Sequence, residues 1–352
     1  MTVYAIWNNK GGVGKSYLTF QIASEYAIQH PNKKVLVIDL CPQANSSSML
    51  LGGIVGGEAR LSTIHAGNPR NTIAGYIEDR ILSPYVNMNT GANFVTQVAQ
   101  HNNRVPDNLF LVVGDEQLEI QASRVMSATY PGPQDAWRIV HTWISDLIND
   151  IANRWDQEEH TVFIDCNPSF SVYTELALAA ADRLIIPFSA DGSSKRAVRA
   201  VLSLVYGITR QAGQQQSEFY LNSQRYRMSL PEIYMYVGNR LTQMNQSSAA
   251  AFKTVVNEIG DEIYAVWQSS ANLFCIHPNG TATPTSKRTF KTMFQYEVND
   301  ANTASVVSGA CGIPISILGA GQVAVLGRPV TVNQSQLDKQ VPNIISLVQA
   351  IE

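Results

Sequence analysis

The sequence predicts an α/β protein with a mostly parallel, doubly wound sheet and helices on both faces. Short runs rich in β-branched and aliphatic residues alternate with stretches of helical periodicity, which is the rhythm of consecutive βα units. These strand-like runs lack a clean alternation of apolar and polar residues, as expected for strands buried under helices on both sides. A glycine-rich turn between the first strand and the first helix adds the context of a phosphate-binding loop.

The predicted elements follow in chain order. The first strand is expected at residues 3–7 and the first helix at residues 17–23. The later strands are expected at residues 34–38, 109–113, 161–164, 184–186, 233–237 and 313–318. Apolar residues spaced three and four apart predict one long amphipathic helix over residues 137–155. Residues 341–351 are apolar at helical spacing and carry no Lys or Arg, so we expect a packing helix there and no membrane anchor.

Length and composition favour one elaborated domain over residues 1–352. A chain of 352 residues with 45% hydrophobic side chains can bury a large core. Three polar stretches with turn residues, near 46–70, 211–227 and 268–299, are expected to be exposed loop elaborations on this core. The net charge of −3 excludes a global basic field, so any contact with DNA must come from a local patch.

Cysteine spacing and the lack of a leader indicate a cytoplasmic protein. Cys41, Cys166, Cys275 and Cys311 lie far apart without C-x-x-C spacing, which argues against a zinc ribbon, an iron–sulfur scaffold or a disulfide framework. The first strand begins almost at the N-terminus, and no apolar run approaches the roughly 18 residues of a membrane span. We therefore expect a soluble protein of the reducing cytoplasm.

The run from Asn8 to Ser16 predicts a site for a nucleoside triphosphate. A phosphate-binding loop surrounds phosphates with backbone N–H groups, its lysine reaches the β and γ oxygens, and its hydroxyl meets Mg²⁺. Lys15 and Ser16 occupy the last two positions here. The other residues expected to bind the nucleotide are Gly11, Gly12, Val13, Gly14 and Tyr17. Asn9 replaces the usual first glycine, and Lys10 adds a second cation at the mouth of the loop.

This form, K-G-G-x-G-K-[ST], resembles the deviant Walker A loop of the ParA/MinD family of dimerising P-loop ATPases. The resemblance is greatest to small ParA-type partition ATPases that lack an N-terminal helix-turn-helix domain. It implies ATP and Mg²⁺ as cofactors and a homodimer that encloses two ATP molecules. In such a dimer Lys10 would cross to the partner's phosphates, where it would stabilise both the dimer and the charge that develops during phosphoryl transfer.

The second motif, residues 37–45, resembles the D-x-D-P-Q-x-N switch of this family. Asp39 matches the first acid, which helps to order Mg²⁺, but Cys41 replaces the second, catalytic acid. A neutral thiol cannot accept a proton or orient water comparably, so we expect impaired hydrolysis, either natural or introduced to hold ATP. The alternative is that Cys41 is a packed small hydrophobe and that Asp39 or Asp165 has taken over its role.

Two further elements complete the implied nucleotide site. Residues 163–169 resemble the Walker B strand and second switch, usually D-C-P-P-S, although Asn167 replaces a proline. Asp165 would accept a hydrogen bond from a water bound to Mg²⁺. Asn239, followed by Arg240, matches the position at which relatives read the adenine edge; the alternative is a turn asparagine at a strand end.

Basic residues after the strand at 184–186 are candidates for contacting DNA. The candidates on one predicted helix and along its axis are Lys195, Arg196, Arg199 and Arg210, and a second cluster holds Lys287, Arg288 and Lys291. Relatives carry DNA-binding residues in this part of the chain or nearer the C-terminus; the alternative is a solvated helix face. The resemblance thus implies a nucleoid-associated ATPase that binds non-specific DNA and positions plasmid, chromosome or other cargo.

That activity would depend on a ParB-like or other cargo adaptor protein as partner. The chief alternative is a related ATP-gated switch that positions or regulates a protein complex without a role in genome segregation. A metabolic P-loop enzyme is disfavoured because the sequence shows no signature for binding a phosphate acceptor.

Overall fold

A mixed, mostly parallel sheet forms the centre of the molecule. The computed structural model describes residues 1–352 except 131, 210–212, 242–245 and 278–282. Within those described residues, an eight-stranded sheet has the strand order β3-β4-β2-β5-β1-β6-β7-β8. The edge strand β3 pairs antiparallel with β4, and the other neighbouring strands are parallel. The fold class that the sequence predicts is confirmed.

The strands fall close to the positions that the apolar runs predict. The sheet contains β1 (Thr2–Ile6), β2 (Lys34–Asp39), β3 (Val95–Gln97), β4 (Leu109–Val112), β5 (His160–Asp165), β6 (Arg183–Phe188), β7 (Glu232–Leu241) and β8 (Gln295–Asn299). A separate antiparallel hairpin consists of β9 (Gly321–Val325) and β10 (Arg328–Val332). Every residue of β5 is buried, and β1, β2 and β6 are buried beyond their first residue, which is why these strands read as continuous apolar runs.

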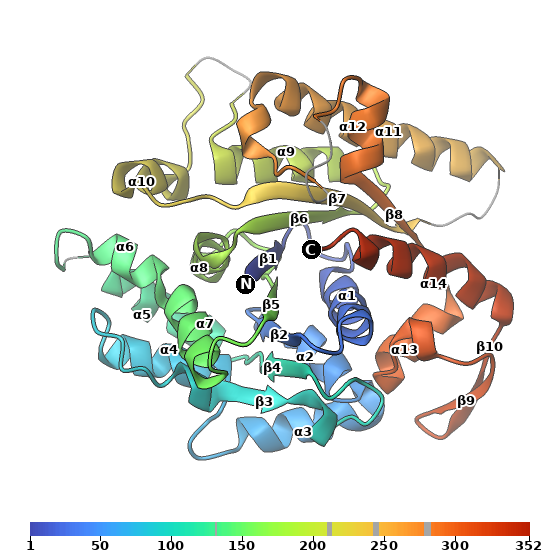
Figure 1. Cartoon of the computed structure of the whole chain (residues 1–352), viewed down its shortest axis with the longest axis horizontal. Helices are drawn as coiled ribbons and strands as arrows, with labels where there is room; N and C mark the ends of the chain where they lie inside the picture. Colours follow the sequence, from blue (N-terminus) through green and yellow to red (C-terminus); the bar gives the residue numbers. More distant parts are fainter. Residues whose placement is uncertain (131, 210–212, 242–245, 278–282) are drawn as a thin grey trace.

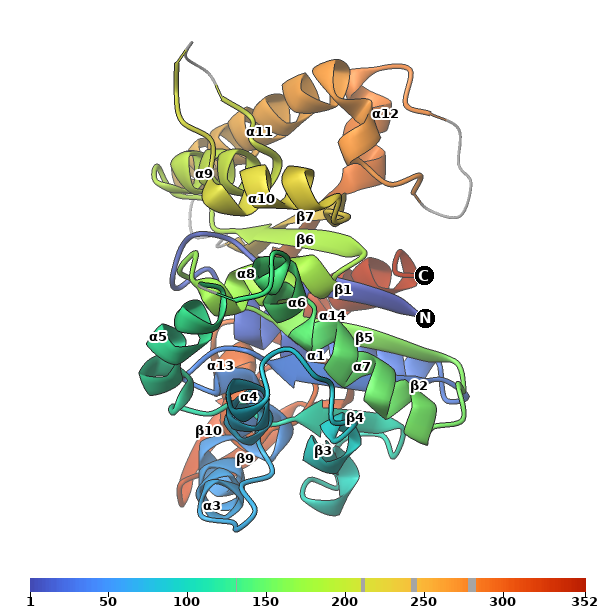
Figure 2. The ribbon, with the colours of Figure 1, turned by 90° about the vertical axis from the view of Figure 1, so that its left-hand side faces the viewer.

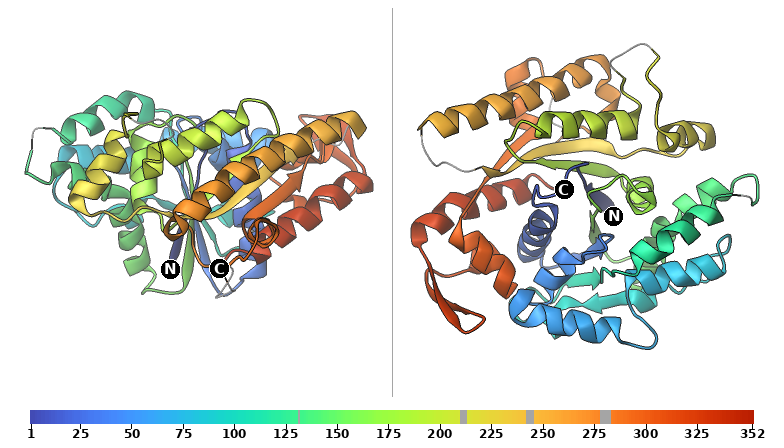
Figure 3. Two further views of the ribbon diagram at one scale, coloured as in Figure 1. Left: turned by 90° about the horizontal axis from the view of Figure 1, so that it is seen from above. Right: turned by 180° about the vertical axis from the view of Figure 1, so that it is seen from behind.

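Helices cover the sheet on both faces. The α-helices are α1 (Lys15–Gln29), α2 (Asn45–Leu50), α3 (Gly53–His65), α4 (Ile73–Leu82), α5 (Leu118–Ala128), α6 (Ala136–His141), α7 (Trp143–Arg154), α8 (Val172–Ala180), α9 (Ser194–Tyr206), α10 (Glu218–Tyr226), α11 (Gln246–Ser269), α12 (Lys287–Phe294), α13 (Thr303–Cys311) and α14 (Gln334–Gln349). In Figures 1 and 2, α1, α13 and α14 lie on one side of the central strands and α4 to α8 on the other. Figure 3 shows α9 and α11 running side by side over the end of the sheet at β6 and β7.

One predicted strand is wrong. Residues 313–318 contain the 3₁₀ turn η4 (Ile315–Ile317), and the last strand of the sheet is β8, in a segment expected to be a loop. Backbone donors in this stretch are already used: Ile313 N–H donates to Ser308 O, and Ile315 N–H donates to the buried Gln21 side chain. Pro314 has no N–H at all, so the segment cannot form a ladder despite its apolar residues.

The predicted loop elaborations contain regular structure. Residues 46–70 hold most of α2 and all of α3, which packs so closely on α13 that a Cβ added at Gly53 would lie 2.3 Å from the carbonyl oxygen of Ala310. The described part of 211–227 includes α10, which starts where Ser217 Oγ accepts a hydrogen bond from Tyr220 N–H. The described part of 268–299 includes α12 and β8. Residues 214–216 do lie in an exposed loop.

The expected helix over residues 137–155 is interrupted. It consists of α6 and α7, which meet at Thr142, where the N–H and the hydroxyl both bond to Ile139 O. Such local bonding by threonine competes with the regular helical pattern. Residues 341–351 fall mostly within the packing helix α14, as predicted. Among the described residues, no helix combines the length and apolar character needed to cross a membrane.

Candidate nucleotide site

The turn between β1 and α1 is shaped to bind an anion. Gly12 and Gly14 have φ values of 76° and 77°, a left-handed conformation that favours glycine, and Gly14 forms the N-cap of α1. No side chain caps this helix end. The free N–H groups and the positive end of the helix dipole can therefore face a phosphate, as the glycine spacing predicts.

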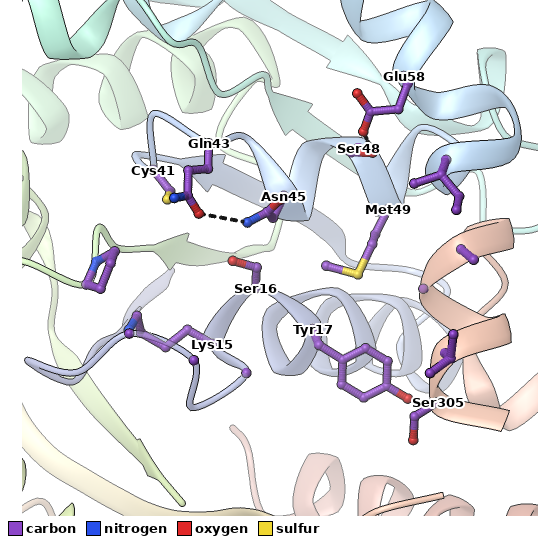
Figure 4. Close-up of a pocket in the computed structure, with 18 of the residues that line it drawn as sticks. Lys15, Ser16, Tyr17, Cys41, Gln43, Asn45, Ser48, Met49, Glu58 and Ser305 are labelled. Atoms are coloured by element: carbon purple, nitrogen blue, oxygen red, sulfur yellow. Dashed lines mark hydrogen bonds between the residues drawn. The ribbon is translucent and has the colours of Figure 1, made fainter. Parts of the chain in front are cut away.

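A cavity of about 620 Å³ opens over this turn. Its volume lies in the range of about 300–1,000 Å³ that is typical of small-molecule sites. The lining residues come from the loop and α1, the turn after β2, the end of β5, α2, α3 and α13, and include Gly11, Gly12, Gly14, Lys15, Ser16, Tyr17, Cys41, Gln43, Asn45, Met49, Cys166 and Val306. Figure 4 shows Ser16 between Lys15 on one side and Cys41 and Asn45 on the other.

Lys15 is folded over its own loop. Its Nζ donates to the carbonyl oxygens of Lys10, at 2.7 Å, and Asn8, at 3.2 Å. Burial lowers the pKa of Lys15, and the nearby Asp165 opposes this effect. Among the described residues, the hydrogen-bond acceptors of this ammonium group are the neutral carbonyls of Asn8 and Lys10, which an anion could displace.

Asp39 forms hydrogen bonds within the turn that follows β2. Its buried carboxylate accepts hydrogen bonds from Cys41 N–H at 3.0 Å, Ser47 N–H at 3.0 Å and Ser47 Oγ at 2.7 Å. Ser47 Oγ in turn accepts from Gly114 N–H, and a Cβ at Gly114 would lie 2.7 Å from the Asp39 carboxyl group. These hydrogen bonds show that Asp39 stabilises the turn after β2. The sequence predicts a different role for Asp39, the ordering of Mg²⁺.

Asp165 has the character of a metal ligand. It lies opposite Asp39 in the parallel register of β2 and β5 and is fully buried. Within the described residues, its carboxylate oxygens make no close hydrogen bond, although the Ser16 and Ser46 hydroxyls lie near enough to lower its pKa. Burial, then the Asp39 charge, raises the pKa of Asp165 to about 7. A buried carboxylate close to the Ser16 hydroxyl fits the oxygen-ligand preference of Mg²⁺.

Replacing Asp165 by asparagine is expected to stabilise the metal-free protein above pH 7. The raised pKa means that the unfolded chain releases this proton near pH 4 while the folded chain keeps it until about pH 7. The free energy of unfolding should therefore fall across this window by up to about 4 kcal/mol, at about 1.4 kcal/mol for each tenfold change in proton affinity. Denaturant unfolding of wild type and Asp165→Asn at several pH values measures the difference.

The exposed Asp107 offers a matched control, because Asp107→Asn removes a carboxylate outside the cavity. Its stability profile should follow that of the wild type. A wild-type slope between pH 4 and 7 in Asp165→Asn would contradict the assignment.

Cys41 lines the cavity but is only 4% exposed. Burial, with the charges of Asp39 and Asp165, raises the pKa of its thiol to about 12. The thiol is therefore protonated at neutral pH and cannot act as a general base. Its burial also fits the packing role that is the alternative for this position.

Asn239 braces the phosphate-binding turn. It is fully buried, and its Nδ2 donates to Val13 O at 2.9 Å and to Gly14 O at 3.3 Å. The structure thus brings Asn239 to the predicted site but uses its amide nitrogen on the loop; Arg240 follows it in β7. The apolar end of the cavity is formed by Tyr17, Met49 and Val306. Sequence reasoning missed the last two because it expected a loop at α2 and no helix at α13.

The predicted DNA-contacting residues are mostly paired with acids of α11. Lys195 Nζ lies 2.9 Å from Glu258, and Arg199 lies 2.5 Å from Glu262. In the second cluster, Lys287 and Lys291 both meet Asp261. Arg196 is exposed and has no ion pair with any described residue, whereas Arg210 lies outside the described residues. Tertiary packing thus brings acids of α11 against Lys195 and Arg199 of α9, and the assignment of these residues to DNA contact stays a prediction.

Lys10 points away from the cavity. Its ammonium group forms an ion pair with Asp191 and donates to Ser189 Oγ at 3.1 Å and Ser194 Oγ at 3.2 Å. The structure therefore places Lys10 with the segment that leads from β6 into α9.

Residues 1–217 match the AAA_31 family, described as "AAA domain". Two curated proteins of Mycobacterium tuberculosis, "Uncharacterized protein Rv1708" and "Uncharacterized protein MT1749", are 25% identical to the chain over 206 residues, which is 58% of this chain and 51% of each relative. The chain thus spans about half the length of these curated relatives.

Solved structures share the fold. Apo McdA from Cyanothece has a TM-score of 0.57 at 16% identity, with 99% of both chains covered. A putative plasmid partition protein from Borrelia burgdorferi, bound to AMPPNP, has a TM-score of 0.52 at 15% identity, with 99% of this chain and 98% of that chain covered. At such identities the likeness shows the architecture, and the chemistry must be argued from the residues of this chain.

Proposed function

This chain belongs to the AAA_31 family and has the fold of the ParA/MinD P-loop ATPases; from that premise we propose that it is a ParA-type ATPase that works as an ATP-dependent dimerisation switch. The observation that carries the proposal is the fully buried Asp165 near Lys15, beneath the cavity that Lys15 and the uncapped glycine turn line. Together these groups supply what a Mg²⁺-bound triphosphate requires: amide donors, a cation and an oxygen ligand.

In the proposed site, the backbone of residues 11–16 binds the phosphates and Lys15 exchanges its carbonyl partners for the β and γ oxygens. Ser16 and Asp165 would hold Mg²⁺, which when bound neutralises charge on the transferred phosphoryl group. Asp39 keeps the turn after β2 in place. The proposed interface forms where Lys10 of each chain meets the partner's nucleotide, so loss of the γ-phosphate would weaken the dimer.

The proposed output is non-specific DNA binding in the cytoplasm on the nucleoid, with a ParB-like or other cargo adaptor that stimulates turnover. Support comes from the exposed Arg196 on α9 and from the architecture shared with a putative plasmid partition protein. The ion pairs that occupy Lys195 and Arg199 favour a second candidate. In that case the dimer positions or regulates a protein complex, and α9 is an ordinary solvated surface.

Sedimentation velocity tests the proposal. The protein is run with ADP, with ATP and with a slowly hydrolysed ATP analogue, each with Mg²⁺ and a labelled DNA duplex at low and high salt. The switch predicts a dimer only with triphosphate, and DNA that sediments with that dimer at low salt and is released as salt rises. A monomer under all conditions would refute the switch, and a triphosphate-dependent dimer without DNA would favour the second candidate.

A further inference from the structure

We propose that Asp191 is a positioning residue that holds Lys10 within its own chain and so sets the ATP concentration at which two chains associate. The inference rests on the proposed function, because it takes Lys10 as the cation that crosses to the partner's nucleotide. The inference adds that the Asp191 carboxylate competes with the partner's nucleotide for the Lys10 ammonium group. Lys10 must leave this carboxylate before it can reach the partner chain.

The contacts of Lys10 use the full donor capacity of its ammonium group. Among the described residues, its acceptors are the Asp191 carboxylate, Ser189 Oγ at 3.1 Å and Ser194 Oγ at 3.2 Å. An ammonium group has three N–H donors, so no donor is left for a phosphate in this arrangement. Lys10 can reach a nucleotide on the partner only by leaving all of these acceptors.

Asp191 is held ready for this role by other donors. Its Oδ2 accepts from Ser189 Oγ at 2.7 Å, and its Oδ1 accepts from Ser193 N–H at 2.9 Å and Ser193 Oγ at 2.8 Å. Burial alone would raise the pKa of Asp191, but the hydrogen bonds from Lys10, Ser189 and Ser193 outweigh it and keep the pKa below its ordinary value. The donors from Ser189 and Ser193 do not depend on Lys10, so they can keep the carboxylate oriented after Lys10 leaves.

The same segment begins α9. Ser194 N–H donates to the main-chain oxygen of Asp191, and Ser194 is the first residue of the helix. Release of Lys10 would thus remove a contact from the first turn of α9, one residue before Lys195. The proposed exchange of Lys10 partners would therefore link the bound nucleotide to α9 through a continuous chain of hydrogen bonds.

Competition from Asp191 should make the association of two chains weaker than it would be if Lys10 were always free. Only chains in which Lys10 is free are competent to associate, and apparent affinity falls by that fraction. The pair is partly exposed, with side chains 22% and 48% accessible, so solvent screens it. We therefore expect removal of the Asp191 charge to lower the triphosphate concentration at half-maximal dimer about three- to tenfold.

Dimer fraction measured by sedimentation against the concentration of a slowly hydrolysed ATP analogue tests this. Asp191→Asn should shift the midpoint to lower concentration, Asp191→Glu should stay near the wild type, and the affinity of the monomer for ADP should not change. Ser189→Ala, which removes one acceptor but keeps the carboxylate, should shift the midpoint in the same direction by less. The control is Asp135→Asn, which breaks an exposed ion pair with Arg138 far along the chain.

The outcomes separate this inference from the proposed function. If wild-type protein dimerises with the analogue and Asp191→Asn has an unchanged or higher midpoint, the Asp191 assignment is overturned and the switch survives. If wild-type protein stays monomeric at saturating analogue, both are overturned. If Asp191→Asn fails to fold, the Ser189→Ala midpoint decides: a shift to lower concentration supports the assignment, and no shift refutes it.

Discussion

Lys10→Ala is expected to weaken the triphosphate-dependent dimer strongly while each monomer still binds nucleotide. Truncating one partner of a desolvated charge pair at an interface costs about 2–5 kcal/mol, so the dissociation constant of the dimer should rise by roughly 30-fold to several thousand-fold. Turnover should fall by about a thousandfold if Lys10 stabilises the transition state as a cation supplied in trans does. Sedimentation with the slowly hydrolysed analogue and phosphate release with ATP measure the two effects.

ADP binding to the Lys10→Ala monomer should be close to that of the wild type, because Lys15 and the loop amides remain. Lys33→Ala is a suitable control, since Lys33 is a partly exposed lysine whose partner is the surface residue Glu159. The variant also provides a double-mutant cycle with Asp191→Asn. In the Lys10→Ala background, Asp191→Asn should have no effect on association; a persisting effect would mean that Asp191 acts through another group.

Cys41→Asp is expected to raise the ATPase rate about 10- to 100-fold. A positioned general base typically contributes about 10²–10⁴ in rate, and the wild-type thiol, with its pKa raised to about 12 by burial, cannot supply one at neutral pH. The new carboxylate would line the cavity beside Ser16. Steady-state phosphate release at saturating ATP and Mg²⁺ is the measurement.

Cys41→Ser separates the carboxylate from a change of packing, because it keeps a small side chain without a base and should not raise the rate. The aspartate variant should also be less stable without nucleotide, since it adds a third acid beside the buried Asp39 and Asp165. If Cys41→Asp still dimerises with the analogue but turns over no faster, Cys41 is a packing residue and another group activates water.

Local signals predicted most of the sheet and the phosphate-binding turn. The apolar runs from β1 to β7 mark strands buried on both faces, with the short edge strand β3 as the exception, because its residues are only half-buried. The prediction of a strand at residues 313–318 was wrong for a physical reason. Apolar side chains of this run are buried, but Pro314 and the hydrogen bond from Ile315 N–H to Gln21 prevent pairing with another strand. Strand β8 was missed because its exposed Glu297 and half-buried Gln295 give it no apolar run.

What the sequence determined by itself is the chemistry of the loop from Asn8 to Ser16, because glycines at positive φ, a lysine and a hydroxyl act within a few residues of each other. Only the tertiary structure decided which partners the charged side chains contact. Lys10 meets Asp191 across 181 residues, and Lys195 meets Glu258 across 63. The sequence around a charged residue does not differ according to whether its side chain faces water or an acid. Which of the two it faces depends on the distant segments that the buried sheet brings next to it.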